Sequence, residues 1–123
     1  ANDVVRGVSY ERFRSTIRSI LMKLESSERV LVVLIPDFSD APRVVERDIN
    51  QSLLAKQIEN YNTILKEEAR RKDRDVIDIT DLGTDKSRYL DDGLHYQEDV
   101  YRTWVEYIME QGGFAQNTTV AKE

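Results

Sequence analysis

The only histidine of the chain, His95, stands three residues after Asp92 in the stretch Leu90-Asp91-Asp92-Gly93-Leu94-His95. The glycine between the two residues permits a tight turn that would bring the carboxylate close to the imidazole. An imidazole, whose pKa is ordinarily near neutrality, activates a weak nucleophile best when its other nitrogen is held by a partner. We therefore interpret His95 as a candidate general base and Asp92 as the residue that orients it.

Metal and thiol chemistry receive little support from the sequence. The 123 residues contain no cysteine, which excludes disulfides and thiolate metal sites. The aspartates around the histidine do not follow the alternating spacing of a calcium-binding loop. They are Asp81, Asp85, Asp91 and Asp92. We accordingly expect no metal ion and no cofactor.

Charge and hydropathy limit the classes of partner. The net charge of −5 does not fit a nucleic-acid binder, which needs clustered lysine and arginine to contact phosphates. The one basic run, residues 70–74, lies at a predicted helix end, where the helix dipole favours cations. No apolar stretch is long enough to cross a bilayer, so we expect no transmembrane segment. The sequence leaves the cellular compartment open.

The elements that would position the candidate site alternate between helix and strand. Ser9 can cap a first helix, and the apolar run 30–35 predicts a strand covered on both faces. A long helix is predicted from about residue 51 to 72, with Asn50 as its cap, and a short strand at 76–79. In each of the two helices the apolar residues form a stripe along one face. The stripe residues are Phe13, Ile17, Ile20, Leu21 and Leu24 in the first helix and Leu54, Ile58, Tyr61 and Leu65 in the second.

Strand, helix and strand in this order predict a parallel pair. The loops after the two strands then leave from the same edge of the sheet, where ligands bind in open α/β folds. His95, in the acidic loop of residues 80–96, would belong to this rim. A last helix of about residues 97–110 is predicted to bury Tyr101, Trp104, Val105 and Ile108 and to end at Gly112-Gly113.

Three blocks of the sequence resemble one enzyme family. Asp92-Gly93-Leu94-His95 near the C-terminus, together with Ala1-Asn2-Asp3 upstream, resembles the SGNH, or GDSL-type, esterases and lipases. Ile35-Pro36-Asp37, directly after a buried strand, is similar to the same family. The resemblance covers nearly the whole chain and implies a three-layer α/β/α, flavodoxin-like fold with a parallel sheet.

The resemblance also implies roles for individual residues. In the family, an Asp-x-x-His block supplies two members of a Ser-His-Asp triad, and a Gly-x-Asn-Asp block supplies an asparagine to the oxyanion hole. The matching positions are Asp92, His95 and Asn2. The implied substrate is a small carboxylic ester: an acetylated carbohydrate, a short acyl ester or a lipid.

The chain departs from the family pattern at the nucleophile. A Gly-Asp-Ser block is absent from the 123 residues, and so is the block with an oxyanion glycine. No serine lies in a Gly-x-Ser-x-Gly setting, although Ser39 on the rim is the nearest candidate. We therefore interpret residues 1–111 as the C-terminal part of a single hydrolase domain and residues 112–123 as a polar tail. By itself this chain is predicted to be inactive.

Two alternatives remain at this stage. Two parallel strands are too few for a stable sheet, so the chain is expected to dock onto the missing N-terminal part of its domain or to self-associate through an open strand edge. The function is either serine-dependent ester hydrolysis or that of a non-catalytic interaction or pseudoenzyme module that keeps the fold.

Overall fold

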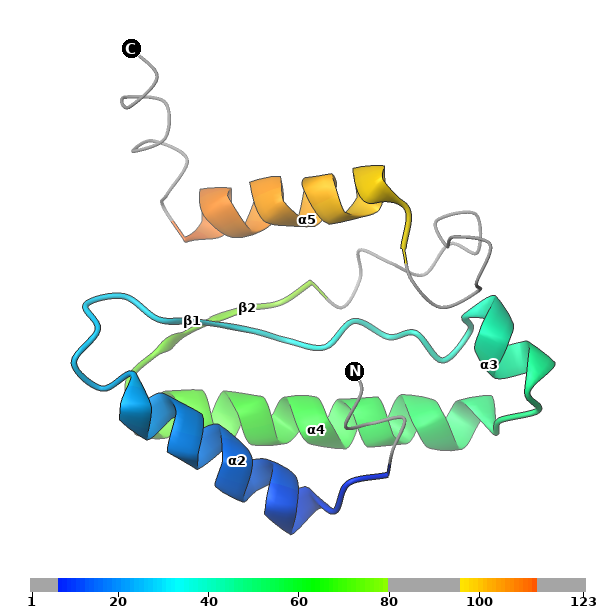
Figure 1. Cartoon of the computed structure of the whole chain (residues 1–123), viewed down its shortest axis with the longest axis horizontal. Coiled ribbons are helices and arrows are strands. Elements are labelled where there is room, and N and C mark those ends of the chain that lie inside the picture. The colour runs from blue at the N-terminus through cyan, green and yellow to red at the C-terminus, as the bar shows by residue number, and fades with distance from the viewer. Residues whose placement is uncertain (1–6, 80–95, 113–123) are drawn as a thin grey trace.

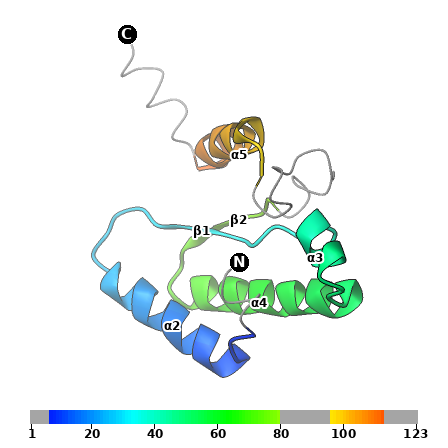
Figure 2. The ribbon, with the colours of Figure 1, turned by 45° about the vertical axis from the view of Figure 1, so that its right-hand side comes forward.

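A computed structural model describes residues 7–79 and 96–112. The chain order is α2 (Tyr10–Lys23), β1 (Leu31–Val33), α3 (Pro42–Glu46), α4 (Gln51–Arg71), β2 (Asp75–Ile77) and α5 (Glu98–Gln111). The two strands form the middle layer, α2 and α4 lie below it, and α5 lies above it (Figures 1 and 2). The predicted α/β class is confirmed for these residues.

The sheet is a parallel pair joined by α4, as the strand–helix–strand order predicts. Val32 is opposite Val76 in the register, and the Leu34 amide continues the ladder by donating to the carbonyl of Ile77 at 3.0 Å. The strands are shorter than the apolar run suggests, because β1 covers residues 31–33 rather than 30–35. The second strand covers residues 75–77 rather than 76–79.

Alternating side chains cover the two faces of the sheet. Val32 and Leu34 are buried on the face toward α4, where Leu34 lines a pocket with α4 side chains. Ile77, which is opposite Val33 in the register, belongs to the other face and is also buried, as is Ile79. The apolar run of β1 is thus buried on one face and partly buried on the other, whereas Val76 of β2 is exposed.

Helix α4 begins and ends as its sequence indicates. The Asn50 side chain accepts a hydrogen bond from the Leu53 amide at 3.0 Å and caps the first turn. All four predicted stripe residues are buried: Leu54, Ile58, Tyr61 and Leu65. Arg70 and Arg71 lie in the last turn, which confirms that part of the basic run as a favourable charge at the helix end.

The turn after α4 joins this helix to the end of α2. Asp73 has a left-handed φ of 55°, and the Arg74 amide donates to the Ala69 carbonyl at 2.8 Å, which closes a Schellman motif. The Arg74 guanidinium then donates to three carbonyls that follow the last turn of α2, at 3.1, 3.1 and 3.2 Å. These carbonyls belong to Ser27, Leu24 and Glu25.

Helix α2 starts at the predicted cap, since Ser9 Oγ accepts from the Arg12 amide at 3.2 Å. Phe13 and Leu21 are buried, but the predicted stripe is too wide: Ile20 and Leu24 are exposed. The reason is that α2 packs on one helix, α4, rather than on the sheet, so only a narrow face of α2 is covered.

Helix α5 buries a smaller set of residues than its sequence predicts. Trp104 is buried, with its ring centroid 4.6 Å from that of Tyr96. Tyr101 and Val105 were expected in the core but are exposed, because only one side of the helix faces the rest of the described chain. Gly112 is the C-cap, as predicted.

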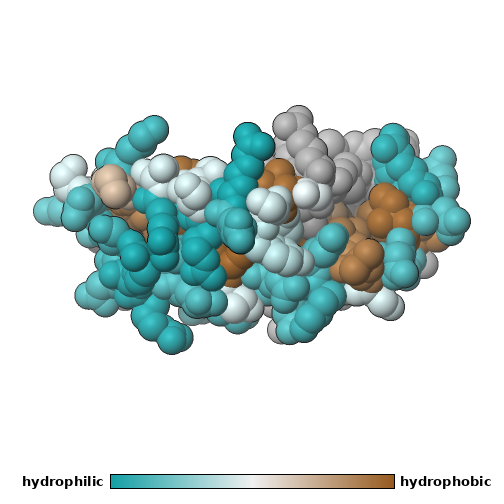
Figure 3. Space-filling view, turned by 90° about the horizontal axis from the view of Figure 1, so that it is seen from below, coloured by the Kyte–Doolittle hydropathy of each residue, from teal (hydrophilic) through white to brown (hydrophobic). Residues whose placement is uncertain are grey.

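The lower surface, formed by α2 and α4, is mainly hydrophilic, with hydrophobic areas toward the end that carries α3 (Figure 3). Exposed apolar side chains of α3 and the first turn of α4 include Val45 and Leu53. Within the described residues, no helix has the length and apolar character needed to span a membrane.

Candidate functional site

The carboxyl ends of β1 and β2 share one edge of the sheet, as the parallel pairing requires. Beside this edge lies a pocket of about 370 Å³ between the strand ends and the middle of α4. Leu34, Ala55 and Ile58 form its apolar part. Its polar lining combines acidic, basic and neutral side chains: Asp37, Glu59, Asn62, Thr63, Lys66 and Asp78. Such a lining can hydrogen-bond a small polar molecule.

Asn62 connects α4 to the end of β1. Its side chain is buried, and its Oδ1 accepts a hydrogen bond from the Ile35 amide at 2.7 Å. Its Nδ2 donates to the Ile35 carbonyl at 2.8 Å. Both backbone groups of the last residue before Pro36 are therefore satisfied by one side chain rather than by a strand.

The loop that follows is held by its own contacts. Asp37 Oδ1 accepts from the Ser39 amide at 2.9 Å, which forms a local Asx turn. Phe38 and Ala41 are buried, and the Ala41 amide donates to the Phe38 carbonyl at 3.0 Å. We call residues 36–41 the rim loop; Asp37 is the residue of this loop that lines the pocket.

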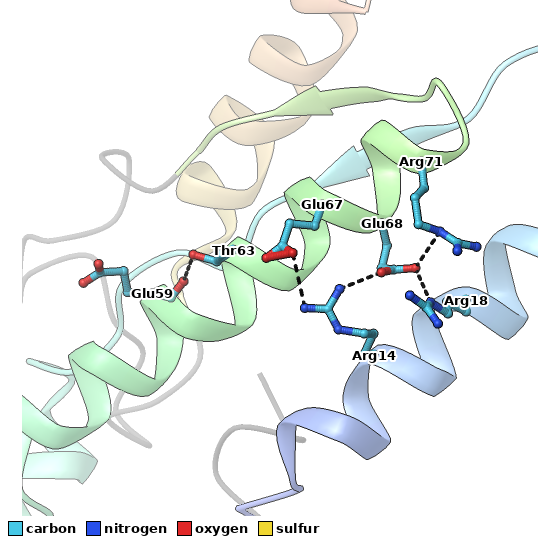
Figure 4. Close-up of polar contacts among 7 residues, drawn as sticks. All are labelled: Arg14, Arg18, Glu59, Thr63, Glu67, Glu68 and Arg71. Atoms are coloured by element: carbon cyan, nitrogen blue, oxygen red, sulfur yellow. Dashed lines mark hydrogen bonds and ion pairs between the residues drawn. The ribbon is translucent and has the colours of Figure 1, made fainter.

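A charged cluster lies away from this rim, between α2 and α4 (Figure 4). The Glu68 side chain is only 1% exposed, and its two oxygens accept from Arg14 Nη1 and Arg18 Nε, each at 2.7 Å. Arg71 Nε lies 3.4 Å from the same carboxylate, and Glu67 lies 3.4 Å from Arg14. The cluster joins two helices across their interface.

The cluster shifts the pKa values of Glu68 and Arg14. Burial acts most strongly and would raise the pKa of Glu68, but hydrogen bonds from Arg18 and Arg14, with the charges of Arg18 and Arg71, together outweigh it. The pKa of Glu68 is consequently below its usual range. The hydrogen bond to Glu68 raises the pKa of Arg14. Both shifts favour the charged forms of Glu68 and Arg14, which strengthens the contact between α2 and α4.

The residues assigned chemical roles from the sequence, Asn2, Asp92 and His95, lie outside the described residues. The described residues that flank the segment with Asp92 and His95 are Ile79 before it and Tyr96 after it. Tyr96, the residue after His95, is buried against Trp104, and its amide donates to the Tyr101 hydroxyl at 3.3 Å. On the other side, Ile79 is buried two residues after β2 ends.

The sequence did not single out Asn62 or Glu68, and Arg74 was interpreted only as part of the basic run 70–74 at a helix end. A signal for the first two was present, because both occupy the buried face of α4: Asn62 follows Ile58 by four residues, and Glu68 follows Leu65 by three. A polar residue inside an apolar stripe indicates a specific buried partner. Comparison with known proteins found no match among protein-family models, curated proteins or solved structures.

Proposed function

We propose that the protein contributes the base half of a serine-dependent ester hydrolase of the SGNH type, with a flavodoxin-like fold. The observation that carries this proposal is the parallel pairing of β1 and β2 through α4. It supports a rim of the kind that binds ligands in α/β folds, with a polar pocket beside it. The segment that contains Asp92 and His95 follows β2 directly in the chain.

The proposed chemistry is acyl transfer. His95 takes the proton of a serine hydroxyl as the oxygen attacks the ester carbonyl, while Asp92 holds the other imidazole nitrogen. Negative charge then develops on the carbonyl oxygen, and the Asn2 carboxamide donates a hydrogen bond to it. His95 returns the proton to the leaving alcohol, and water releases the acid by the same steps.

The serine must come from outside these 123 residues, because no Gly-Asp-Ser block is present. We therefore expect the protein to be active only when a further segment supplies that block. The substrate is a carboxylic ester, either an acetylated carbohydrate, a short acyl ester or a lipid. The carboxylate, amide and ammonium groups of the pocket favour an ester with a polar alcohol part, such as an acetylated carbohydrate.

A second candidate function is that of a non-catalytic module, which the absence of a nucleophile block favours. The two candidates differ in ester hydrolysis by the polypeptide as it is naturally encoded. Acyl esters of sugars and of a chromogenic phenol are suitable substrates. The Asp92→Asn variant is expected to lose turnover by roughly 10⁴-fold, as for the carboxylate of other serine triads.

The neighbouring Asp91 offers a matched control. Asp91→Asn makes the same chemical change one position away and should retain most of the activity. Asn2→Ala is expected to lose roughly 10²- to 10³-fold in turnover, the usual effect of removing one oxyanion donor. Hydrolysis that is equally reduced, or equally intact, in the Asp91 and Asp92 variants would contradict the assigned roles.

A further inference from the structure

We propose that Asn62 is a positioning residue of this site. It fixes the course of the rim loop (residues 36–41) by forming hydrogen bonds with both the amide and the carbonyl of Ile35. This inference rests on the proposed hydrolase function and adds to it a residue of α4 that holds the rim from beneath.

The geometry at the end of β1 shows how the rim loop is directed. Successive backbone groups of a strand point to opposite edges. The Leu34 amide points toward β2, where it donates to Ile77, so the groups of Ile35 point away from β2. Asn62 meets them there with one acceptor at 2.7 Å and one donor at 2.8 Å. Its carboxamide occupies the place that the peptide group of a neighbouring strand would take.

The chemistry of the side chain is specific to this task. A carboxamide carries a donor and an acceptor side by side, whereas an ionised carboxylate can only accept and leucine can do neither. Asn62 is buried, so a group of Ile35 that lost its partner would not readily find water instead. The residue after Ile35 is Pro36, which has no amide proton with which to extend the ladder.

The hydrogen bonds between Asn62 and Ile35 affect the pocket through the rim loop, because a residue of this loop lines the pocket. Asp37 lies two residues beyond Ile35 and lines the pocket together with Asn62 itself. The buried Phe38 then anchors the far side of the loop. Asp37 therefore lies between two fixed residues, Ile35 on one side and Phe38 on the other. Releasing Ile35 would free one of these two anchors.

The first test follows hydrogen exchange of single backbone amides in Asn62→Leu. The Ile35 amide loses its acceptor and should exchange about five- to tenfold faster, the worth of one hydrogen bond. The Leu34 amide is an internal control, because its acceptor is the Ile77 carbonyl. Equal acceleration at both amides would mean general loosening and would overturn the specific link between Asn62 and the loop.

The second test uses Asn62→Asp, which is nearly the same shape, and measures ester hydrolysis by the naturally encoded polypeptide between pH 5 and 8. Its carboxylate faces the Ile35 carbonyl without a proton to donate, so kcat/KM should be about tenfold or more below that of the unmodified protein at pH 8. Protonation restores the donor, and burial raises the pKa of such a carboxyl. The ratio of variant to unmodified kcat/KM should therefore rise as the pH falls.

Asn60→Asp is the matched control, since Asn60 lies two residues away on α4 and its Nδ2 donates to the Tyr10 hydroxyl of α2. The ratio of its kcat/KM to that of the unmodified protein should stay constant with pH. The titration of the catalytic base cancels in this ratio, because both variants and the unmodified protein share that base. A flat ratio for Asn62→Asp in an active enzyme would overturn the positioning role alone. A folded, unmodified protein without any ester hydrolysis would overturn the proposed function, and the positioning role with it.

Discussion

Arg18 Nε of α2 lies 2.7 Å from Oε1 of Glu68, a carboxylate of α4 that is only 1% exposed. With Arg14 on the other oxygen, this pair places a hydrogen-bonded charge inside an interface that also contains the edge-to-face contact of Phe13 and Tyr61. A buried carboxylate without its partners would be costly, so the arginines and Glu68 stabilise the α2–α4 packing only as a set.

Replacing Glu68 by glutamine should reduce the free energy of unfolding by about 1–2 kcal/mol. The amide that replaces one oxygen can only donate, and it would face a donor of an arginine. The loss stays moderate because Arg14 and Arg18 retain access to water, with 32% and 47% of their side chains exposed. Urea denaturation measures the change. Glu67→Gln, at the exposed neighbour, should match the unmodified protein, and an equal loss in both variants would contradict the special role of Glu68.

The same carboxylate makes stability depend on acid pH. The pKa of Glu68 is lower in the folded state than in the unfolded state. The stabilisation that the Glu68 carboxylate provides is therefore complete above the ordinary glutamate pKa of about 4.3. It is lost as the pH falls through the lower pKa of Glu68 in the folded state. The difference in unfolding free energy between the unmodified protein and Glu68→Gln should shrink over that acid range. A difference that stays constant from pH 7 to pH 3 would disprove this assignment.

Arg74 should stabilise the end of α2, although it is not part of that helix. Its guanidinium donates to three backbone carbonyls, so Arg74→Ala is expected to reduce stability by about 1–2 kcal/mol in urea denaturation. The stability of Arg74→Lys should lie between those of Arg74→Ala and the unmodified protein, because an ammonium cannot match the planar fork of a guanidinium. Arg70→Ala, which removes an exposed arginine of the last turn of α4, serves as the control. A greater loss in Arg70→Ala than in Arg74→Ala would contradict this role.

The outer edge of β1 is expected to make the isolated chain associate. Leu31 and Val33 are only partly buried, and no further strand pairs with β1 among residues 7–79 and 96–112. Sedimentation velocity at increasing concentration should show dimers or larger species. Val33→Lys should reduce this association more than Val76→Lys on β2. A monodisperse monomer that unfolds cooperatively would contradict the expectation.

The sequence predicted the elements better than their extents. Ser9 and Asn50 marked the starts of α2 and α4 correctly, because an N-cap acts through local hydrogen bonds. The apolar run 30–35 predicted too long a strand, since the ladder ends where Ile35 turns to Asn62, a residue distant in sequence. Tyr101 and Val105 were wrongly placed in the core because periodicity shows which residues share a helix face, not how much of the helix is covered.

The candidate site, too, could be predicted from the sequence only in part. The parallel order of the strands, and hence a rim that contains the ends of both, followed from the alternation of elements. The hydrogen bonds between Asn62 and Ile35 could not be predicted in this way, because the two residues are distant in sequence and meet only in the folded chain. The roles of Asn2, Asp92 and His95 stay predictions from the resemblance, since these residues lie outside the described part of the chain.

The most direct test of the proposed hydrolase is covalent labelling of the naturally encoded polypeptide with a fluorophosphonate probe, which reacts with activated serines. We expect the unmodified protein to be labelled, His95→Ala to lose the label while keeping its fold, and the isolated 123-residue chain to stay unlabelled. Labelling that persists in His95→Ala, or a folded unmodified protein that takes up no label, would contradict the proposal.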